Sequence, residues 1–250
     1  MARGSETLAF TVTYGDRGDL RDFAAQMRGT AGVWYDHALY LGDPSDRLRQ
    51  QGEALLADPD RLGIQHLVVW PENRGQHHAF REALALARRE GYTWLLRLDD
   101  DILPKTKKWL LKMQQRLEEI RKIKDDKFYR IVASPRIMGL RNPLQPIGTM
   151  HLGQSFPVEV MEHLGGACRL HPVELLAEFA PDLHAPLGRG DPEALAEYLA
   201  GTVAGVQVRF PDLRVRHYTD ELEARDTDEQ RLIRRMSRFW PYLGPEEPCG

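Results

Sequence analysis

Apolar runs and amphipathic stretches alternate along the first hundred residues of the chain. Four short runs rich in apolar, aromatic or β-branched residues predict strands at residues 8–14, 33–41, 64–70 and 92–98. Helical spacing of the apolar residues between these runs predicts three helices, at residues 20–27, 48–56 and 79–90. Asp19 is placed to cap the first helix, and Gly91 is placed to end the third.

The second half of the chain has a less regular pattern. A long helix is predicted over residues 105–127, after Pro104 has stopped the pairing of the fourth strand. Residues 141–156 are rich in Pro and Gly, and we expect either a mobile loop over a site or an irregular connection there. Further strands are predicted at residues 128–133, 168–170, 206–210 and 213–217, and further helices at residues 194–199, 220–239 and from His171 onward.

This alternation of strand and helix predicts an α/β protein with a mostly parallel central sheet and helices on both of its faces. Binding sites in such sheets lie beyond the carboxyl ends of the strands. Four predicted loops fall at that edge, at residues 14–17, 42–46, 72–75 and 99–101. The pattern therefore favours a functional site formed by these loops.

Three adjacent acids, Asp99, Asp100 and Asp101, follow the fourth strand directly. Their like charges repel one another, and a divalent cation would remove that cost. Oxygen ligands in this number suit Mg²⁺ or Mn²⁺, which in turn can hold a diphosphate. The structural alternative is a solvated acidic turn that caps the following helix.

Composition narrows the class of protein. The chain has 250 residues with 42% hydrophobic and 28% charged residues, which is ordinary for a globular protein of one domain. The net charge of −3 excludes a globally basic nucleic-acid binder but allows a local basic face. Two distant cysteines, Cys168 and Cys249, predict neither a disulfide framework nor a zinc site. With no long apolar run and no signal pattern, we expect a cytoplasmic protein without stable membrane insertion, and we infer no obligate protein partner.

Two other segments have both a structural and a functional interpretation. The long helix predicted at residues 105–127 carries nine Lys or Arg and four Asp or Glu, so it is either a solvated face or a surface for a polyanion. Gly165 and Gly166 permit close approach of the backbone to a ligand, or form a tight turn in a packed sheet. Asp191 before Pro192 is a good helix cap, which accounts for it structurally.

Four blocks of sequence occur in a fixed order: Thr11–Tyr14; Gly42–Asp46; Asn73-Arg74-Gly75 with Leu98–Asp101; and Gly190–Glu193 with Val208–Asp212 and His217. Their order resembles that of the GT-A glycosyltransferases, in particular the inverting family two, over roughly residues 7 to 218. Gly190 stands where that family usually has Glu, and residues 180–189 are not recognisably similar to it. The resemblance implies a Rossmann-like GT-A fold in a single domain.

The same resemblance implies an inverting transfer of a sugar from a nucleotide-sugar, a UDP-sugar by preference. It assigns Asp99, Asp101 and His217 to Mn²⁺ or Mg²⁺, Asp191 or in reserve Glu193 to the catalytic base, and Gly165 and Gly166 to the acceptor side. Arg97 is a further candidate to pair with the acids or the diphosphate. The implied donor-binding residues are Thr13, Tyr14, Asp43, Asn73, Arg74, Gly75, Arg97 and Asp100.

The acceptor stays open at this point. One hypothesis is a hydroxymethylated base in DNA, as in phage-type DNA modification, and the alternatives are a saccharide, a protein or a small molecule. A nucleotidyltransferase and an inactive nucleotide-sugar-binding module are alternatives of a different class.

We expect a GT-A domain at residues 1–218, with a donor-binding half at 1–104 and an acceptor half at 128–218, followed by a C-terminal helix and tail at 219–250.

Overall fold

The computed structural model describes residues 5–14, 19–58, 62–72, 74–124, 131–139, 145–151, 155–161, 164, 166–179 and 206–217. Its helices are α1 (Leu20–Ala31), α2 (Asp46–Leu56), α4 (Gln76–Glu90), α5 (Trp109–Lys124) and α6 (Val173–Phe179). The first five strands are β1 (Thr7–Tyr14), β2 (Asp36–Gly42), β3 (Ile64–Trp70), β4 (Trp94–Leu98) and β5 (Ile102–Pro104). The others are β6 (Ile131–Met138), β7 (Pro146–Met150), β8 (Val158–Met161), β9 (Cys168–Pro172) and β10 (Val206–His217).

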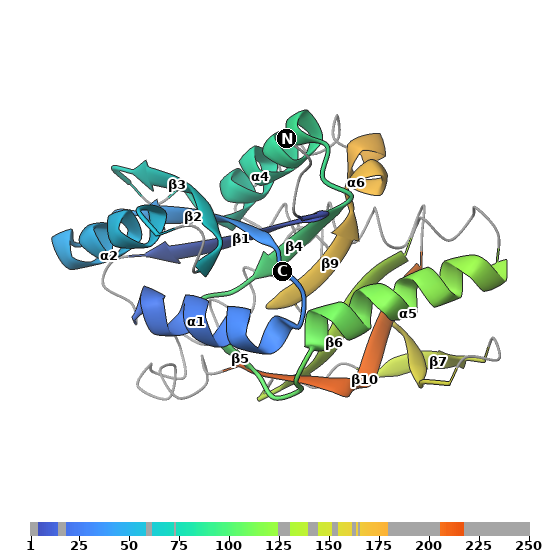
Figure 1. Ribbon diagram of the computed structural model, residues 1–250. Helices are drawn as coiled ribbons and strands as arrows, with labels where there is room; N and C mark the ends of the chain where they lie inside the picture. The colour runs from blue at the N-terminus through green and yellow to red at the C-terminus, as the bar shows by residue number, and fades with distance from the viewer. Residues whose placement is uncertain are drawn as a thin grey trace, which may run out of the picture.

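One twisted sheet joins all of these strands in the order β3-β2-β1-β4-β9-β6-β10-β8-β7, and β5 pairs with β10 (Figure 1). Strands β3, β2, β1 and β4 pair in parallel, and so do β6 and β10. The remaining pairs are antiparallel, among them β4 with β9 and β10 with β8. The predicted α/β class with a parallel core is confirmed, and antiparallel strands extend that core on one side.

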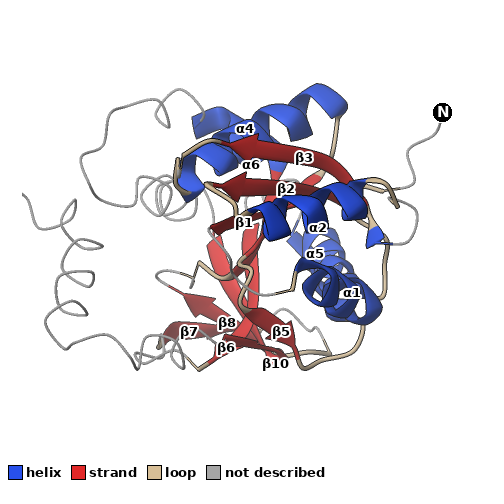
Figure 2. Cartoon of the chain, turned by 90° about the vertical axis from the view of Figure 1, so that its left-hand side faces the viewer, coloured by secondary structure: helices blue, strands red, loops and turns tan. Residues whose placement is uncertain are grey.

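Helices cover both faces of the sheet because consecutive residues of β1 point to opposite faces and are apolar on each of them. Leu8 and Phe10 pack in one cluster with α4 and α6, whereas Ala9 packs in another with α1 and α5. Leu39 and Leu41 of β2 join α1 and α2 in a third cluster. Figure 2 shows α1, α2 and α5 on one side of the sheet and α4 with α6 on the other. None of the described helices is long and apolar enough to cross a membrane.

The ends of the helices follow the local signals in the sequence. The Asp19 carboxylate accepts hydrogen bonds from the backbone N–H groups of Arg21 and Asp22, which confirms the predicted cap of α1. The Ser45 hydroxyl caps α2 in the same way by accepting from the N–H of Leu48. Gly91 ends α4 with a left-handed backbone at φ 69°, as predicted.

The long helix begins four residues later than the sequence predicted. Residues Ile102–Pro104 form β5, a strand that the sequence did not predict, and it pairs antiparallel with β10. Pro104 is the last residue of this three-residue strand, so regular pairing ends at Pro104 as predicted. Helix α5 then starts at Trp109, and its predicted apolar stripe is buried, namely Trp109, Leu110, Met113, Leu117 and Ile120.

Two further predictions of the second half are corrected. Residues 146–150, expected to be irregular, form β7, which pairs with β8. The two strands expected on either side of Pro211 are one strand, β10, with an irregularity between Phe210 and Arg214 in its pairing with β6. His171 and Pro172 belong to β9, and α6 begins at Val173. The helices predicted at residues 194–199 and 220–239 lie outside the described residues, as does the tail.

A buried histidine makes the stability of the fold depend on pH. His37 of β2 is 1% exposed, and its Nε2 lies 2.9 Å from the Thr11 hydroxyl. Burial, with a contribution from the Arg28 charge, lowers the pKa of His37 to about 3 from 6.5. The unfolded chain therefore binds a proton below pH 6.5 that the native chain does not bind until about pH 3, and stability falls as the pH decreases through this window.

We expect His37→Gln to remove part of that pH dependence. Between pH 7.5 and pH 5 the wild-type chain should lose about 2 kcal/mol of unfolding free energy through His37 alone. The variant should not lose this amount, although its stability at pH 7.5 is lowered by the altered core. Urea unfolding at several pH values measures the difference, and an equal decrease in both proteins contradicts the assignment.

Candidate functional site

The described ends of β1, β2 and β3 lie level with one another at the same edge of the sheet. Tyr14, the last residue of β1, is level with Gly42 of β2, and Gly42 is level with Trp70 of β3. Asp43 follows Gly42 with a left-handed backbone at φ 46°, and its N–H donates to the Trp70 carbonyl over 3.0 Å. A non-glycine residue in this conformation is uncommon, and its exposed carboxylate stands at the edge where ligands of such sheets bind.

The three consecutive acids turn the chain from β4 into β5. Asp99 follows Leu98, its N–H donates to the Ala167 carbonyl over 2.9 Å, and Asp100 and Asp101 form the turn. Because β5 pairs with the end of β10, His217 lies level with Ile102, next to this turn. A residue more than a hundred positions away in the sequence is thereby brought to the acids.

Asp99, Asp101 and His217 form a group that could hold one metal ion. The His217 Nε2 lies 3.3 Å from the Asp101 Oδ1 and 4.0 Å from the Asp99 Oδ2, and the three ligand atoms are within 4.8 Å of one another. Two ligands that share one ion at ~2.1 Å each lie at most about 4.2 Å apart, so the two distances from His217 suit a common ion. Two carboxylate oxygens and an imidazole nitrogen are a donor set that Mn²⁺ accepts.

The Oδ1 atom of Asp99, which does not face His217, accepts hydrogen bonds from two neighbouring side chains. The Gln76 amide donates to the Asp99 Oδ1 over 3.2 Å, and the Arg97 Nε donates to the same atom over 3.3 Å. The Arg97 Nη2 also donates to the Gln76 side-chain carbonyl, which closes a triangle of three side chains. This arrangement leaves the Asp99 Oδ2 directed toward His217.

Gly166 supports this triangle from the other side. A Cβ atom at Gly166 would lie 3.1 Å from the Arg97 Nη2 and 3.3 Å from its Cζ, so a larger residue would push against the guanidinium. The close approach permitted by this glycine is therefore to Arg97. The predicted acceptor role of Gly166 stays a prediction, and Gly165 lies outside the described residues.

Two buried arginines lie opposite each other on β4 and β9, and one of them contacts Asp99. Arg97 of β4 is level with Arg169 of β9, and they are 5% and 6% exposed. Arg169 donates a hydrogen bond to the Leu164 carbonyl. Burial lowers the pKa of His171, and the positive charges of Arg169 and Arg97 lower it further. The buried Cys168 thiol, next to Arg169, has its pKa raised by burial and by the Asp99 charge, so it stays a neutral thiol.

The remaining predicted residues fall into two groups. Thr13 is fully buried, Tyr14 is half-buried, and Gly75 precedes α4 with φ 80°. The Arg74 Nη1 lies 3.2 Å from the His78 Nε2. Four predicted residues lie outside the described part of the chain, namely Asn73, Gly165, Asp191 and Glu193.

Sequence reasoning missed Gln76 and Arg169. Gln76 is the first residue of α4 and directly follows the Asn73-Arg74-Gly75 block, so its position beside the strand edge was a usable signal. Arg169 alternates with the buried Cys168 and Leu170 in β9, and only the pairing of β9 with β4 places it opposite Arg97.

We expect Gln76→Ala to weaken Mn²⁺ binding by about 10- to 100-fold, because partners that orient a ligand typically contribute this much. The first position of a helix tolerates Ala, so the melting temperature without metal should change little. Titration with Mn²⁺ followed by electron paramagnetic resonance measures the affinity. Gln50→Ala, at an exposed position of α2, is the matched control. Unchanged affinity in Gln76→Ala would show that Gln76 does not orient Asp99.

Comparison with known proteins gives structural similarity without sequence similarity. No family model matches the sequence, and no curated protein matches it. A mannosyltransferase from Pyrobaculum calidifontis, solved with GDP-Man and Mn²⁺, superposes with a TM-score of 0.60 at 13% identity, over 99% of this chain and 67% of that chain.

Two other solved structures are similar over much of this chain. GalNAc-T7, solved with UDP, GalNAc and Mn²⁺, has a TM-score of 0.57 at 12% identity over 84% of this chain and 42% of that chain. TarS from S. aureus has a TM-score of 0.53 at 12% identity over 90% of this chain and 41% of that chain. The chain thus spans about two fifths of the length of each of these two proteins. These similarities and the sheet topology show that the chain has the GT-A fold of glycosyltransferases, as the sequence motifs predicted.

Proposed function

We propose that this protein is a metal-dependent glycosyltransferase that moves a sugar from a nucleotide-sugar, by preference a UDP-sugar, to an acceptor hydroxyl. The observation that supports this most strongly is the Asp99–Asp101–His217 group at the carboxyl edge of the parallel strands of a GT-A fold. Two similar structures were solved with a nucleotide or nucleotide-sugar and Mn²⁺. The ligand atoms of the group and its position at the strand ends support the binding of such a donor through the metal.

In this proposal the edge of the sheet binds the donor. Asp43 and the end of β1 at Thr13 and Tyr14 hold the base, and Arg74 and Gly75, which precede α4, also contact the donor. Asp99, Asp101 and His217 hold Mn²⁺ or Mg²⁺, and Gln76 and Arg97 keep the Asp99 carboxylate oriented. The ion, when bound, neutralises the negative charge that develops on the leaving diphosphate.

The chemical step needs a base on the acceptor side. Asp191, or in reserve Glu193, removes the proton of the acceptor hydroxyl as its oxygen attacks the anomeric carbon from the face opposite the diphosphate. The bond from that carbon to the diphosphate oxygen breaks with its electron pair, and the configuration at the carbon inverts. The acceptor that we favour is a hydroxymethylated base in DNA, which supplies the hydroxyl. The alternatives are a saccharide, a protein or a small molecule.

A donor screen tests this proposal. The purified protein is incubated with Mn²⁺ and a panel of UDP-, GDP-, dTDP- and CMP-sugars, and each donor is scored for thermal stabilisation and slow hydrolysis. We expect one class of donor to stabilise the protein in the presence of the metal and to be hydrolysed slowly. No response to any donor, with or without metal, would contradict the proposal. Donor binding without any turnover would favour an inactive nucleotide-sugar-binding module.

A nucleotidyltransferase is the alternative enzyme class, because nucleotidyltransferases also bind a divalent metal through acidic side chains on an α/β sheet. The screen is therefore repeated with free nucleoside triphosphates. Release of diphosphate from a triphosphate, without sugar transfer, would favour that alternative.

A further inference from the structure

Two arginines lie directly opposite each other on the ladder between β6 and β10. Arg136 of β6 is level with Arg214 of β10, and both side chains are exposed. Like charges placed directly opposite on neighbouring strands destabilise a sheet. Among the described residues, neither guanidinium has a hydrogen bond or an ion pair to a protein group. The pair therefore leaves an uncompensated positive charge on this face.

The carboxylates near this pair are bound to other arginines. Asp212, which is the acid of β10, accepts two hydrogen bonds from Arg116 of α5, at 2.7 and 2.5 Å. Burial acts to raise the pKa of Asp212, but the hydrogen bonds and the charge of Arg116 outweigh it and lower this pKa, which favours the charged carboxylate. Glu159 of β8 pairs at 2.5 Å with Arg209, which lies earlier on β10. Arg209 is thus neutralised by a cross-strand acid, whereas Arg214 faces another arginine.

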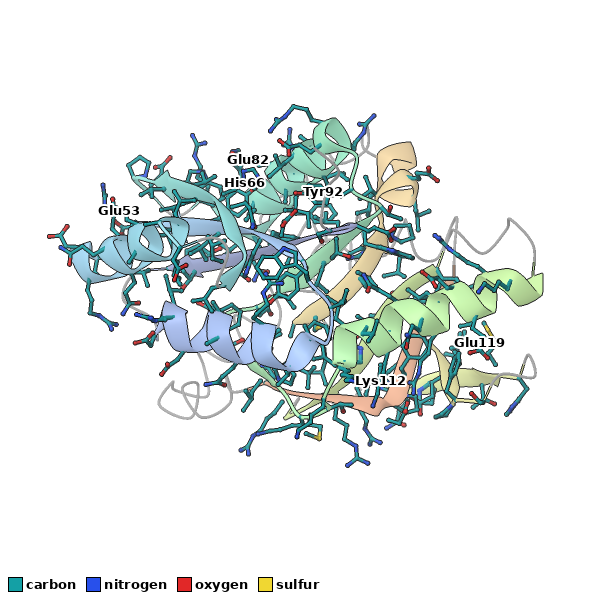
Figure 3. All side chains as sticks on the ribbon, viewed as in Figure 1. Glu53, His66, Glu82, Tyr92, Lys112 and Glu119 are labelled. Atoms are coloured by element: carbon teal, nitrogen blue, oxygen red, sulfur yellow. The ribbon has the colours of Figure 1, made fainter. Side chains whose placement is uncertain are left out.

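Two more basic residues extend the charge of the pair. Arg216, two positions along β10, is exposed, and the exposed Lys105 donates its backbone N–H to the Arg214 carbonyl over 2.8 Å. We call Lys105, Arg136, Arg214 and Arg216 the β10 basic surface. It lies on the face away from α5, because the alternate residues Ile137 and Val215 pack toward the core that contains α5. Figure 3 shows side chains with nitrogen at their tips extending from β10 and β5 on this side.

The β10 basic surface begins beside the metal group. Arg216 directly precedes His217, and it is level with Leu103, two residues after Asp101. At ~3.3 Å per residue, Arg214 and Arg216 lie ~7 Å apart along the strand. Two nucleotides of one DNA strand rise by about the same distance, at ~3.4 Å each.

We propose that the β10 basic surface binds the phosphodiester backbone of a nucleic acid and so positions the acceptor of the transferase. This inference rests on the proposed function, and it adds the surface of the protein that binds the nucleic-acid acceptor. Arginine suits the role because its planar guanidinium binds phosphate oxygens in pairs and is always charged. The protein as a whole carries a net charge of −3, so binding depends on this local surface and not on overall attraction.

The test compares two double variants in binding to a labelled DNA duplex. Arg136→Ser with Arg214→Ser removes the facing pair, and Arg49→Ser with Arg88→Ser removes two exposed arginines of α2 and α4. Affinity is measured by fluorescence anisotropy at salt concentrations from about 50 to about 200 mM. We expect the first variant to bind about tenfold more weakly or worse at the lowest salt, with a salt slope smaller in magnitude by about two. The second variant should bind like the wild type.

Three results would overturn the inference. One is an unchanged affinity and salt slope in the Arg136/Arg214 variant. Another is an equal loss in the Arg49/Arg88 variant, since that would show a general effect of charge. The third is competition by inorganic polyphosphate as strong as that by DNA at equal phosphate concentration, since that would make the surface a general polyanion site.

Thermal stabilisation by Mn²⁺ and UDP separates this inference from the proposed function. If both double variants respond to Mn²⁺ and UDP like the wild type, they are folded and their donor sites are intact. A loss of DNA binding then belongs to the surface itself. If the wild type does not respond to Mn²⁺ and any nucleotide, the proposed function fails, whatever the DNA measurements give.

Discussion

Replacing Asp101 with Asn should abolish the Mn²⁺-dependent binding of the nucleotide-sugar and lower its turnover by a factor of about 10³ or more. A metal that stabilises the leaving group contributes several kcal/mol to the transition state, and each 1.36 kcal/mol is tenfold in rate. Asp101 is the residue to change first because its carboxylate lies 3.3 Å from His217, whereas Asp99 also pairs with the buried Arg97. Thermal stabilisation by Mn²⁺ with UDP measures binding, and donor hydrolysis measures turnover.

The stability of the same variant without metal separates a metal ligand from a structural acid. Asp101 stands in a run of three carboxylates, so removing one charge relieves repulsion and should leave the melting temperature unchanged or raised. Asp22→Asn, at an exposed acid in the first turn of α1, is the control and should keep the full response to Mn²⁺. If Asp101→Asn also keeps that response, the metal assignment is wrong.

The parallel half of the sheet was predictable because local signals and tertiary structure agree there. The apolar run at residues 64–70 is the whole of β3, and the amphipathic pattern before Gly91 is α4 to its last residue. Each of these elements buries a face that its own sequence marks as apolar. The predicted ends of other elements were wrong by a few residues. The strand predicted at residues 33–41 begins at Asp36, because Trp34 and Tyr35 are apolar residues that lie outside β2.

The antiparallel half was less predictable because its strands are defined by distant partners. β5 has only three residues and ends in proline, and it exists because β10 pairs with it more than a hundred residues later. β7 has largely exposed residues, so no apolar period marks it, and it is formed by pairing with β8. A short strand of this kind carries almost no signal in its own sequence.

The candidate site shows the same division. The three acids were visible as an unusual local charge run, but their meeting with His217 came from the family resemblance and needs the β5–β10 pairing. Gln76 was missed because a glutamine at a helix start has many structural roles, and only the fold shows its contact with Asp99. The facing arginines Arg136 and Arg214 are 78 positions apart, and nothing local joins them.

Asp191→Asn should lower the turnover number by a factor of about 10²–10⁴ while it leaves donor binding intact, because a general base contributes this much to proton removal. The variant is informative because Asp191 precedes Pro192 in the sequence, a pattern that predicts a helix cap. Asn caps a helix as well as Asp does, but an amide cannot take the proton. Steady-state transfer to the acceptor, with Mn²⁺ and UDP stabilisation as the binding readout, measures the two effects separately.

Glu193→Gln is the matched variant, because it removes the other carboxylate of the same segment and keeps its size. If Asp191 is the base, Glu193→Gln should keep most of its turnover, and the melting temperatures of both variants should match that of the wild type. A large loss in Glu193→Gln alone would move the role of the base to Glu193. Full turnover in both variants would show that neither carboxylate removes the proton, because the loss of a general base lowers turnover by a factor of about 10²–10⁴.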